Sequence, residues 1–193
     1  MFFIGFWYNL IKMGFEYDII KFLQANATSQ WISFFQTITM LGSFLGFFIT
    51  FILVFIKNKK LSIALAVTFV VASVFNHFLK AIVSRARPFD TYTDIINYGN
   101  EDGFSFPSGH SLCAGMFATF LFYTLMNCTK NKWTIILGGL SLSLLTILIA
   151  LSRMVLGVHY LTDTIIGIFM GILFAIIGIL LYNTLSKKVK KRK

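Results

Sequence analysis

Three short segments of this chain carry the residue types that acid–base and nucleophilic chemistry requires. The third segment contains His159, which stands four residues before Asp163. On a helix, side chains at that spacing share a face and can form a hydrogen bond. A carboxylate on one imidazole nitrogen fixes the tautomer and leaves the other nitrogen free as a nucleophile or base. His159 and Asp163 are therefore a candidate catalytic pair.

The second segment, Phe106–His110, directly precedes a long uncharged stretch. Pro107 and Ser108 are common residues at the start of a helix. A helix N-terminus offers free N–H groups and a partial positive charge to an anion, and Gly109 would let a ligand approach the backbone closely. His110 could exchange protons with a group bound there.

The first segment adds Lys80, Arg85 and Arg87, and Arg153 in the third segment is a fourth cation. Taken alone, Lys80 could reach from the end of an apolar helix to the membrane surface, and Arg87 before Pro88 could simply end a helix. Together, cations and helix N–H groups suit a phosphate. Two histidines and a carboxylate suit a displacement on phosphorus, with one histidine as nucleophile and the other as general acid.

Metal chemistry fits these residues poorly. The sequence shows no cluster of carboxylates that would hold Mg²⁺, and a zinc site would need three or four ligands. We therefore expect neither a metal ion nor any other cofactor. Cys113 and Cys128 lie about 22 Å apart by helical rise, too far to form a disulfide, so both are expected to serve packing.

The elements that must position these segments are predicted to be membrane helices. Of the 193 residues, 57% are hydrophobic and only 12% are charged, half of the roughly 25% usual in soluble domains. Five stretches without Lys, Arg, Asp or Glu are long enough to cross about 30 Å of hydrocarbon. They are Thr39–Ile56, Leu61–Leu79, Ser111–Thr129, Trp133–Ser152 and Thr164–Ser186. Because hydrocarbon leaves the backbone no water to bond, each stretch is expected to be a helix.

The expected fold class is all-α, a polytopic membrane helix bundle with five full transmembrane helices plus an N-terminal short or interfacial helix. Met1–Met13 would be only about 20 Å long as a helix. It could be an interfacial helix, a short tilted sixth span or a signal-like segment, and a retained helix is favoured. Phe15–Gln36 is amphipathic and is expected to lie on the outer surface. One domain is expected, with N-terminal helices over 1–38, the bundle over 39–186 and a basic tail over 187–193.

The net charge of +10 separates into two groups across these five spans. Eleven basic residues fall on one side, namely Lys57, Lys59, Lys60, Lys130, Lys132, Lys187, Lys188, Lys190, Lys191, Arg192 and Lys193. All seven acidic residues fall on the other side with the three segments. The positive-inside rule makes the basic side cytoplasmic. The tail is then a topology anchor that could also attract anionic lipid, and no nucleic-acid partner is expected.

The three segments resemble, in order, the three-part signature of the type 2 phosphatidic acid phosphatase family. The eleven matching positions are Lys80-x6-Arg87-Pro88, Pro107-Ser108-Gly109-His110 and Ser152-Arg153-x5-His159-x3-Asp163. This region is under half of the chain, and the flanking helices resemble the family only in their general pattern. Members of this kind usually have six spans, so here the first would have to come from Met1–Met13.

The resemblance implies a role for each matching residue. His159 would attack phosphorus and form a phosphohistidine, Asp163 would orient and activate it, and His110 would protonate the leaving oxygen. The residues that would bind the phosphoryl oxygens are Lys80, Arg87, Ser108, Gly109 and Arg153. The family works without metal. Arg85 lies outside the signature and is either an auxiliary headgroup contact or an ordinary solvated loop charge.

Further residues are expected to support the site or the packing. Gly167, Gly171 and Ala175 continue the four-residue spacing of Asp163, which indicates a close helix–helix contact and turns Asp163 into the bundle. Gly42 and Gly46 would form another close-packing pair. Asn76 and His77, shortly before Lys80, either support the site or make ordinary hydrogen bonds between helices.

The expected function is that of a lipid phosphatase in a cell membrane, with its site at the extracytoplasmic face. The small size and the composition of the chain favour a bacterial plasma membrane. Undecaprenyl diphosphate and phosphatidylglycerol phosphate are the leading substrates, followed by phosphatidate. A lipid-to-lipid phosphotransferase would use the same site with a lipid hydroxyl as acceptor. A non-enzymatic lipid transporter or scaffold is a third alternative. The sequence makes no prediction about the oligomeric state.

Overall fold

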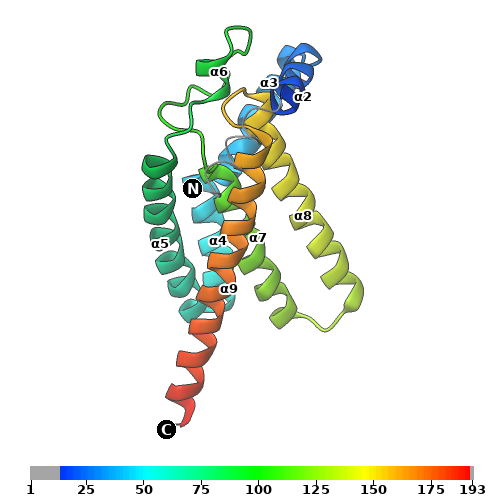
Figure 1. Cartoon of the computed structure of the whole chain (residues 1–193). Helices are drawn as coiled ribbons and strands as arrows, with labels where there is room; N and C mark the ends of the chain where they lie inside the picture. Colours follow the sequence, from blue (N-terminus) through cyan, green and yellow to red (C-terminus); the bar gives the residue numbers. More distant parts are fainter. Residues whose placement is uncertain (1–13, 192–193) are drawn as a thin grey trace.

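The computed structural model describes residues 14–191, with side chains to residue 187, and all regular secondary structure in this part of the chain is helical (Figure 1). The expected helix at Met1–Met13 lies outside the described residues. The elements are α2 (Gly14–Ala25), α3 (Ser29–Thr39), the 3₁₀ turn η1 (Met40–Gly42), α4 (Phe44–Lys57), α5 (Lys59–Val83), α6 (Pro88–Thr91), α7 (Gly109–Cys128), α8 (Lys132–Val155) and α9 (Leu161–Lys191). The predicted all-α class is confirmed.

Four helices, α5, α7, α8 and α9, are long and apolar enough to cross a membrane. Helices α5, α8 and α9 each contain one of the predicted spans and extend beyond it, because a helix continues through charged residues at its ends, whereas α7 ends at Cys128, one residue before its predicted end. The segment over 187–191, predicted as a tail, continues α9. The protein is thus a polytopic membrane helix bundle.

The first predicted span, Thr39–Ile56, is wrong in its start. Thr39 ends α3, and α4 begins only at Phe44 and has 14 residues, which reach about 21 Å. A bend of 51° separates α3 and η1 from α4, and the two parts together could form a fifth span. The bend also explains Gly46, where an added Cβ would lie 1.8 Å from the carbonyl oxygen of Leu41 on the adjoining turn.

The predicted amphipathic segment Phe15–Gln36 is two helices rather than one. The chain breaks after α2, and the Thr28 hydroxyl then caps α3 by accepting a hydrogen bond from the backbone N–H of Trp31. On α2, Ile20 is fully buried and packs in a cluster with Met154 and Tyr160. The helix α2 is therefore attached to the rest of the fold beside the segment that carries His159.

The core is built around α7, which contacts α4, α5, α8 and α9. The predicted close contact of α9 is confirmed, and it is made with α7. A Cβ added at Gly167 would lie 2.6 Å from the carbonyl oxygen of Ser108, and one at Gly171 would lie 2.0 Å from that of Leu112. Ala175 and Asp163 are fully buried on the same side of α9.

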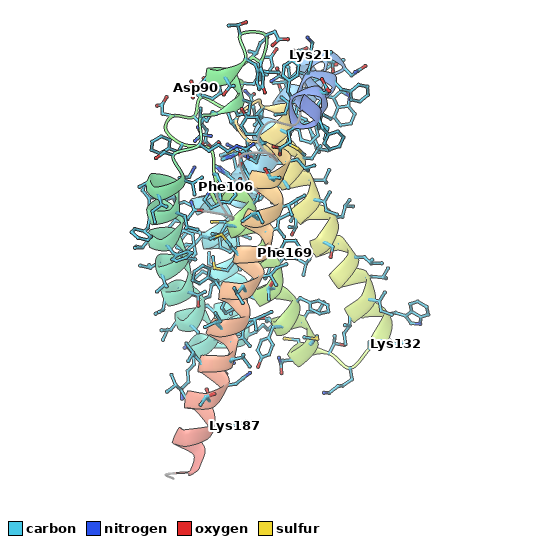
Figure 2. All side chains as sticks on the ribbon, viewed as in Figure 1. Lys21, Asp90, Phe106, Lys132, Phe169 and Lys187 are labelled. Atoms are coloured by element: carbon cyan, nitrogen blue, oxygen red, sulfur yellow. The ribbon has the colours of Figure 1, made fainter. Side chains whose placement is uncertain are left out.

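The charged residues divide between the two ends of the bundle. At the end here called the site end, α5 finishes at Val83 and α9 starts at Leu161. Figure 2 shows Lys21 and Asp90 at this end and Lys132 and Lys187 at the opposite, basic end. For the residues whose side chains are described, the structure therefore separates the two charge groups along the bundle as the sequence predicts.

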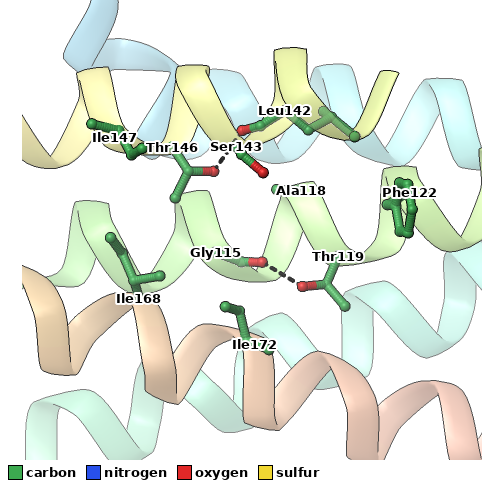
Figure 3. Close-up of a pocket in the computed structure, with 11 residues that line it drawn as sticks. Gly115, Ala118, Thr119, Phe122, Leu142, Ser143, Thr146, Ile147, Ile168 and Ile172 are labelled. Carbon is green, nitrogen blue, oxygen red and sulfur yellow. Dashed lines mark hydrogen bonds between the residues drawn. The ribbon is translucent and has the colours of Figure 1, made fainter. Parts of the chain in front are cut away.

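Toward the basic end, α8 diverges from α7 and α9 (Figure 1). A groove of about 380 Å³ remains between the three helices (Figure 3). The hydroxyls of Thr119 and Thr146 in its wall donate to carbonyls of their own helices, at 2.8 and 2.9 Å. The residues that line this groove include no titratable side chain, so the chemistry must lie elsewhere.

Candidate active site

A larger cavity of about 660 Å³ opens at the site end, between α4, α5, α7 and the loop that joins α5 to α7. Its walls include five of the eight residues that the sequence analysis assigned to the site, namely Lys80, Arg87, Gly109, His110 and His159. The other three, Arg153, Ser108 and Asp163, lie directly behind these residues. The structure therefore brings all eight residues together.

His159 lies in the turn between α8 and α9, not on the helix that carries Asp163. Gly157 has a φ of +74°, which favours glycine. This turn allows the backbone N–H groups of Val158 and His159 both to donate to the carbonyl of Arg153, at 3.1 and 3.2 Å. The imidazole is thus held at the floor of the cavity and is 1% exposed.

Asp163 meets His159 from the first turn of α9. Its Oδ2 lies 3.5 Å from Nδ1 of His159 and accepts a hydrogen bond of 2.9 Å from the backbone N–H of Tyr160. On the other side of the ring, Nε2 of His159 lies 3.5 Å from the Arg87 guanidinium. Burial, together with the charges of Arg153, Lys80 and Arg87, holds the pKa of His159 well below its usual value. Its imidazole is therefore neutral at neutral pH, with Nε2 directed toward the cations.

Ser108 and Gly109 form the start of α7. The Ser108 hydroxyl caps the helix by accepting from the Ser111 N–H at 3.4 Å. Its own N–H donates to the backbone carbonyl of Asp163 at 3.1 Å, which ties α7 to α9. A Cβ added at Gly109 would meet only Asn76 Nδ2, at 3.4 Å. The helix N-terminus, with its free N–H groups, is thus accessible from the cavity.

The cations are held in place by backbone carbonyls and a hydroxyl. Arg87 is 2% exposed and donates to the carbonyls of Gly103, Val158 and Asp102, at 2.9, 2.9 and 2.8 Å. Arg153 donates to the Thr39 hydroxyl at 2.7 Å. Lys80, in the last turn of α5, donates to the carbonyl of Phe104. These bonds order the loop around the cavity and aim positive charge into it.

Glu101 is a site residue that the sequence analysis missed. One carboxylate oxygen accepts from Arg153 at 2.5 Å and lies 3.6 Å from Nδ1 of His110, while the other accepts from Arg87 at 3.2 Å. Burial raises its pKa, but the charges of Arg153 and Arg87 help to outweigh burial, and the pKa is lowered to about 2. No sequence signal distinguishes Glu101 from Asp102, which contributes its carbonyl instead.

Both sequence-based alternatives for Arg85 are wrong. Arg85 is 7% exposed and does not line the cavity. It donates to Asp163 Oδ1 at 2.5 Å and to Glu16 Oε2 at 2.7 Å, and its guanidinium stacks 3.8 Å from the ring centre of Tyr160. Asp163 is fully buried, so a buried cation is the partner that its charge requires. Glu16, on α2, was also missed, because nothing near it in the sequence marks it.

Asn76 and His77 both line the cavity on its α5 side. The hydrogen bonds between helices considered for them do not occur among the described residues, and Oδ1 of buried Asn76 has no partner there. Cys113 and Cys128 are both free. In the part of the chain that the structure describes, no group of three or more His, Cys, Asp or Glu residues could hold a metal ion.

Comparison with known proteins places the chain in a family. A model described as the PAP2 superfamily matches residues 61–187. An undecaprenyl-diphosphatase of Sulfolobus acidocaldarius is 30% identical over 135 residues, which are 69% of this chain and 61% of that protein. Phosphatidylglycerophosphatase B of Bacillus subtilis is 36% identical over 103 residues, 51% of this chain and 46% of that protein. The matches thus span less than two thirds of the length of both relatives.

Two crystal structures share the fold. Aquifex aeolicus LpxE superposes with a TM-score of 0.73 at 25% identity, over 87% of this chain and 96% of that one. A PAP2-type phosphatidylglycerolphosphate phosphatase from Bacillus subtilis gives 0.74 at 24% identity, over 92% and 87%. The family model covers well over half of the chain, from α5 to α9, and includes every residue of the three segments. The chain is therefore an integral membrane protein that belongs to the PAP2 superfamily.

Proposed function

We propose that the protein is a membrane lipid phosphatase that hydrolyses a phosphomonoester or diphosphate of a lipid, with its site at the extracytoplasmic face. The arrangement of His159 carries the proposal. A neutral, buried imidazole has a carboxylate 3.5 Å from one ring nitrogen and a guanidinium 3.5 Å from the other. That is the arrangement a nucleophile needs if it is to attack an anion held by cations.

The first step transfers the phosphoryl group to the protein. The lone pair of Nε2 on His159 attacks phosphorus, the bond between phosphorus and the lipid oxygen breaks, and His110 gives a proton to that oxygen. The phosphoryl oxygens are held by Lys80, Arg87, Arg153, Ser108 and the N–H groups of Gly109 and its neighbours. The negative charge of Asp163 stabilises the positive charge that develops on the ring of His159.

The second step releases phosphate. Water attacks phosphorus as His110 takes up a proton from it, the bond between phosphorus and Nε2 breaks, and His159 returns to its neutral form. The step needs no metal ion and no further co-reactant. The same site would act as a phosphotransferase if a lipid hydroxyl took the place of water.

The cavity supports a lipid as the leaving group. Away from the cations its wall is apolar and is formed by Phe44, Phe69 and Leu112 on α4, α5 and α7. The segregation of basic residues at the opposite end of the bundle supports the extracytoplasmic placement of the site. Undecaprenyl diphosphate and phosphatidylglycerol phosphate are the leading substrates, in keeping with the names of the two relatives, and phosphatidate follows.

The test is phosphate release by the purified protein from these three lipids, with and without EDTA. We expect release from at least one lipid in EDTA and its loss in His159→Ala. Lys132→Ala, at the basic end, controls for expression and handling. A phosphorylated lipid acceptor in place of inorganic phosphate would show phosphotransfer. No release from any lipid, complete loss in EDTA, or full activity of His159→Ala would overturn the proposal.

A further inference from the structure

Behind His159, on the side away from the cavity, lies a buried chain of three charges. Asp163 accepts from Arg85 at 2.5 Å, and Arg85 donates in turn to Glu16 at 2.7 Å. The three residues are 0%, 7% and 6% exposed. Glu16 comes from α2, outside residues 61–187 that match the family model.

The net charge of these three residues determines the electrostatic environment of His159. An Arg85–Asp163 pair alone sums to zero, so it would offer little attraction to a positive charge on the imidazole. Glu16 adds a second carboxylate and brings the three side chains to a net charge of −1. When Nε2 bonds to phosphorus the ring becomes cationic, and it then lies between this negative group and the site cations. In a buried site such charges act strongly because little solvent screens them.

Glu16 also anchors the helix that carries Asp163. Its Oε1 accepts from the backbone N–H of Thr162 at 2.8 Å and from the Thr162 hydroxyl at 2.9 Å. Thr162 is in the first turn of α9, where a carboxylate is favoured by the helix dipole. The Thr162 hydroxyl lies 2.8 Å from the Arg85 guanidinium as well. The contact therefore joins α2, the loop after α5 and the start of α9 at one point.

We infer that Glu16 and Arg85 are positioning residues for the nucleophile, with Arg85 orienting Asp163 and Glu16 balancing the charge of Arg85 so that Asp163 retains its effect on His159. This inference rests on the proposed function. It makes the N-terminal helix α2 part of the catalytic apparatus. The charged and titratable groups that face Arg85 are Glu16, Asp163 and Tyr160. Those that act on His159 are Arg153, Lys80, Arg87 and Glu101.

The test compares kcat and KM of single variants at Glu16 with those of a matched control. Glu16→Gln keeps the shape of the side chain but makes the three-residue group neutral. We expect kcat to fall about 10- to 100-fold with little change in KM, as for partners that orient catalytic ligands elsewhere. Asp18→Asn is the matched control, because it removes the same charge from an exposed position of the same helix, and it should behave as the parent protein.

Glu16→Asp separates an electrostatic role from a structural one. It keeps the net charge of −1 on the three residues, so it should retain more activity than Glu16→Gln even if both variants are equally destabilised. A purely structural role predicts that the two variants lose activity in proportion to their loss of stability.

Three outcomes would overturn the inference: unchanged kcat in Glu16→Gln, a Glu16→Asp variant no more active than Glu16→Gln, or an equal loss in Asp18→Asn. The acid limb of the kcat/KM profile adds a readout that folding alone does not move. It should lie at lower pH in Glu16→Gln, because a neutral group no longer favours a proton on His159. If His159→Ala is inactive while Glu16→Gln matches the parent protein, this inference fails and the proposed function stands.

Discussion

The carboxylate of Glu101 accepts a hydrogen bond of 2.5 Å from the guanidinium of Arg153. Its second oxygen is 3.2 Å from the guanidinium of Arg87. Under the proposed function both arginines bind phosphoryl oxygens, so Glu101 and the phosphate of a substrate compete for the same hydrogen-bond donors. The short distance to His110, 3.6 Å, means that the same carboxylate also favours a proton on the proposed general acid.

Glu101→Gln is therefore expected to affect binding and turnover in opposite directions. With the competing charge removed, inorganic phosphate should inhibit at concentrations about three- to tenfold lower. At the same time kcat should fall, because His110 loses the anion that favours its protonated form. Inhibition and turnover are measured with the same lipid substrate. Asp90→Asn, an exposed acid at the same end of the bundle, is the control, and an unchanged inhibition constant in Glu101→Gln would contradict the expectation.

Glu101 should also make stability depend on pH in the acid range. Its pKa is lowered from 4.5 to about 2 in the folded protein, so its stabilising effect is fully present above pH 4.5 and is lost as the pH falls toward 2. The effect is on the order of 3 kcal/mol. Thermal unfolding in detergent should show a constant difference between the parent protein and Glu101→Gln from pH 7 to 5. The difference should shrink below pH 4.5, and a constant difference down to pH 3 would be the contrary result.

His110 is expected to act as an acid only where the leaving group needs a proton. An aryl phosphate has a leaving oxygen that departs without one, whereas a lipid alkyl phosphate does not. His110→Ala should therefore lose at least about tenfold more activity on the lipid than on the aryl phosphate. His159→Ala, by contrast, should lose both activities. An equal loss on both substrates in His110→Ala would assign this histidine to binding instead.

Gly167→Ala is expected to destabilise the bundle. The added Cβ would lie 2.6 Å from the carbonyl oxygen of Ser108, and backbone cannot move aside as a flexible side chain can. Forcing α9 away from α7 should cost about 1 to 3 kcal/mol, measured as a lower unfolding temperature. Gly14→Ala, with nothing within 4 Å of the new Cβ, is the control. A stable Gly167→Ala variant would show that the helices can separate at no cost.

Gly109→Ala should weaken substrate binding and leave stability unchanged. Its Cβ would meet only Asn76 Nδ2 at 3.4 Å, so the unfolding temperature should stay close to that of the parent protein. The new methyl group would, however, stand where a phosphoryl oxygen approaches the start of α7. We expect KM for the lipid to rise about tenfold, since one hydrogen bond to a charged group is worth about 1.5 kcal/mol or more. An unchanged KM would place the phosphate elsewhere.

Hydropathy alone located most of the bundle. The stretches Ser111–Thr129 and Trp133–Ser152 fall almost wholly within α7 and α8, because an uncharged run of that length has few alternatives to a helix in a membrane. The same argument failed at Thr39–Ile56. There the chain bends at η1, and hydropathy carries no information about a bend that depends on the fit of Leu41 against Gly46.

The site could be predicted only in part, for a related reason. Lys80, Arg87, His110 and His159 belong to short patterns in which residue type and spacing are both visible. Glu101 belongs to no such pattern, and neither its charge nor its neighbours distinguish it from Asp102. Its place became evident only from its distances to two arginines and a histidine.

The sequence by itself determined that this is a helical membrane protein and which residues form the three segments, because both properties depend on local composition and spacing. The tertiary structure alone decided how the charges pair. Arg85 meets Glu16 across 69 residues and Asp163 across 78, and no local pattern encodes a pairing over such separations. The physical reason is burial: once helix packing removes these side chains from water, each charge must find a partner, and the fold determines which partners are within reach.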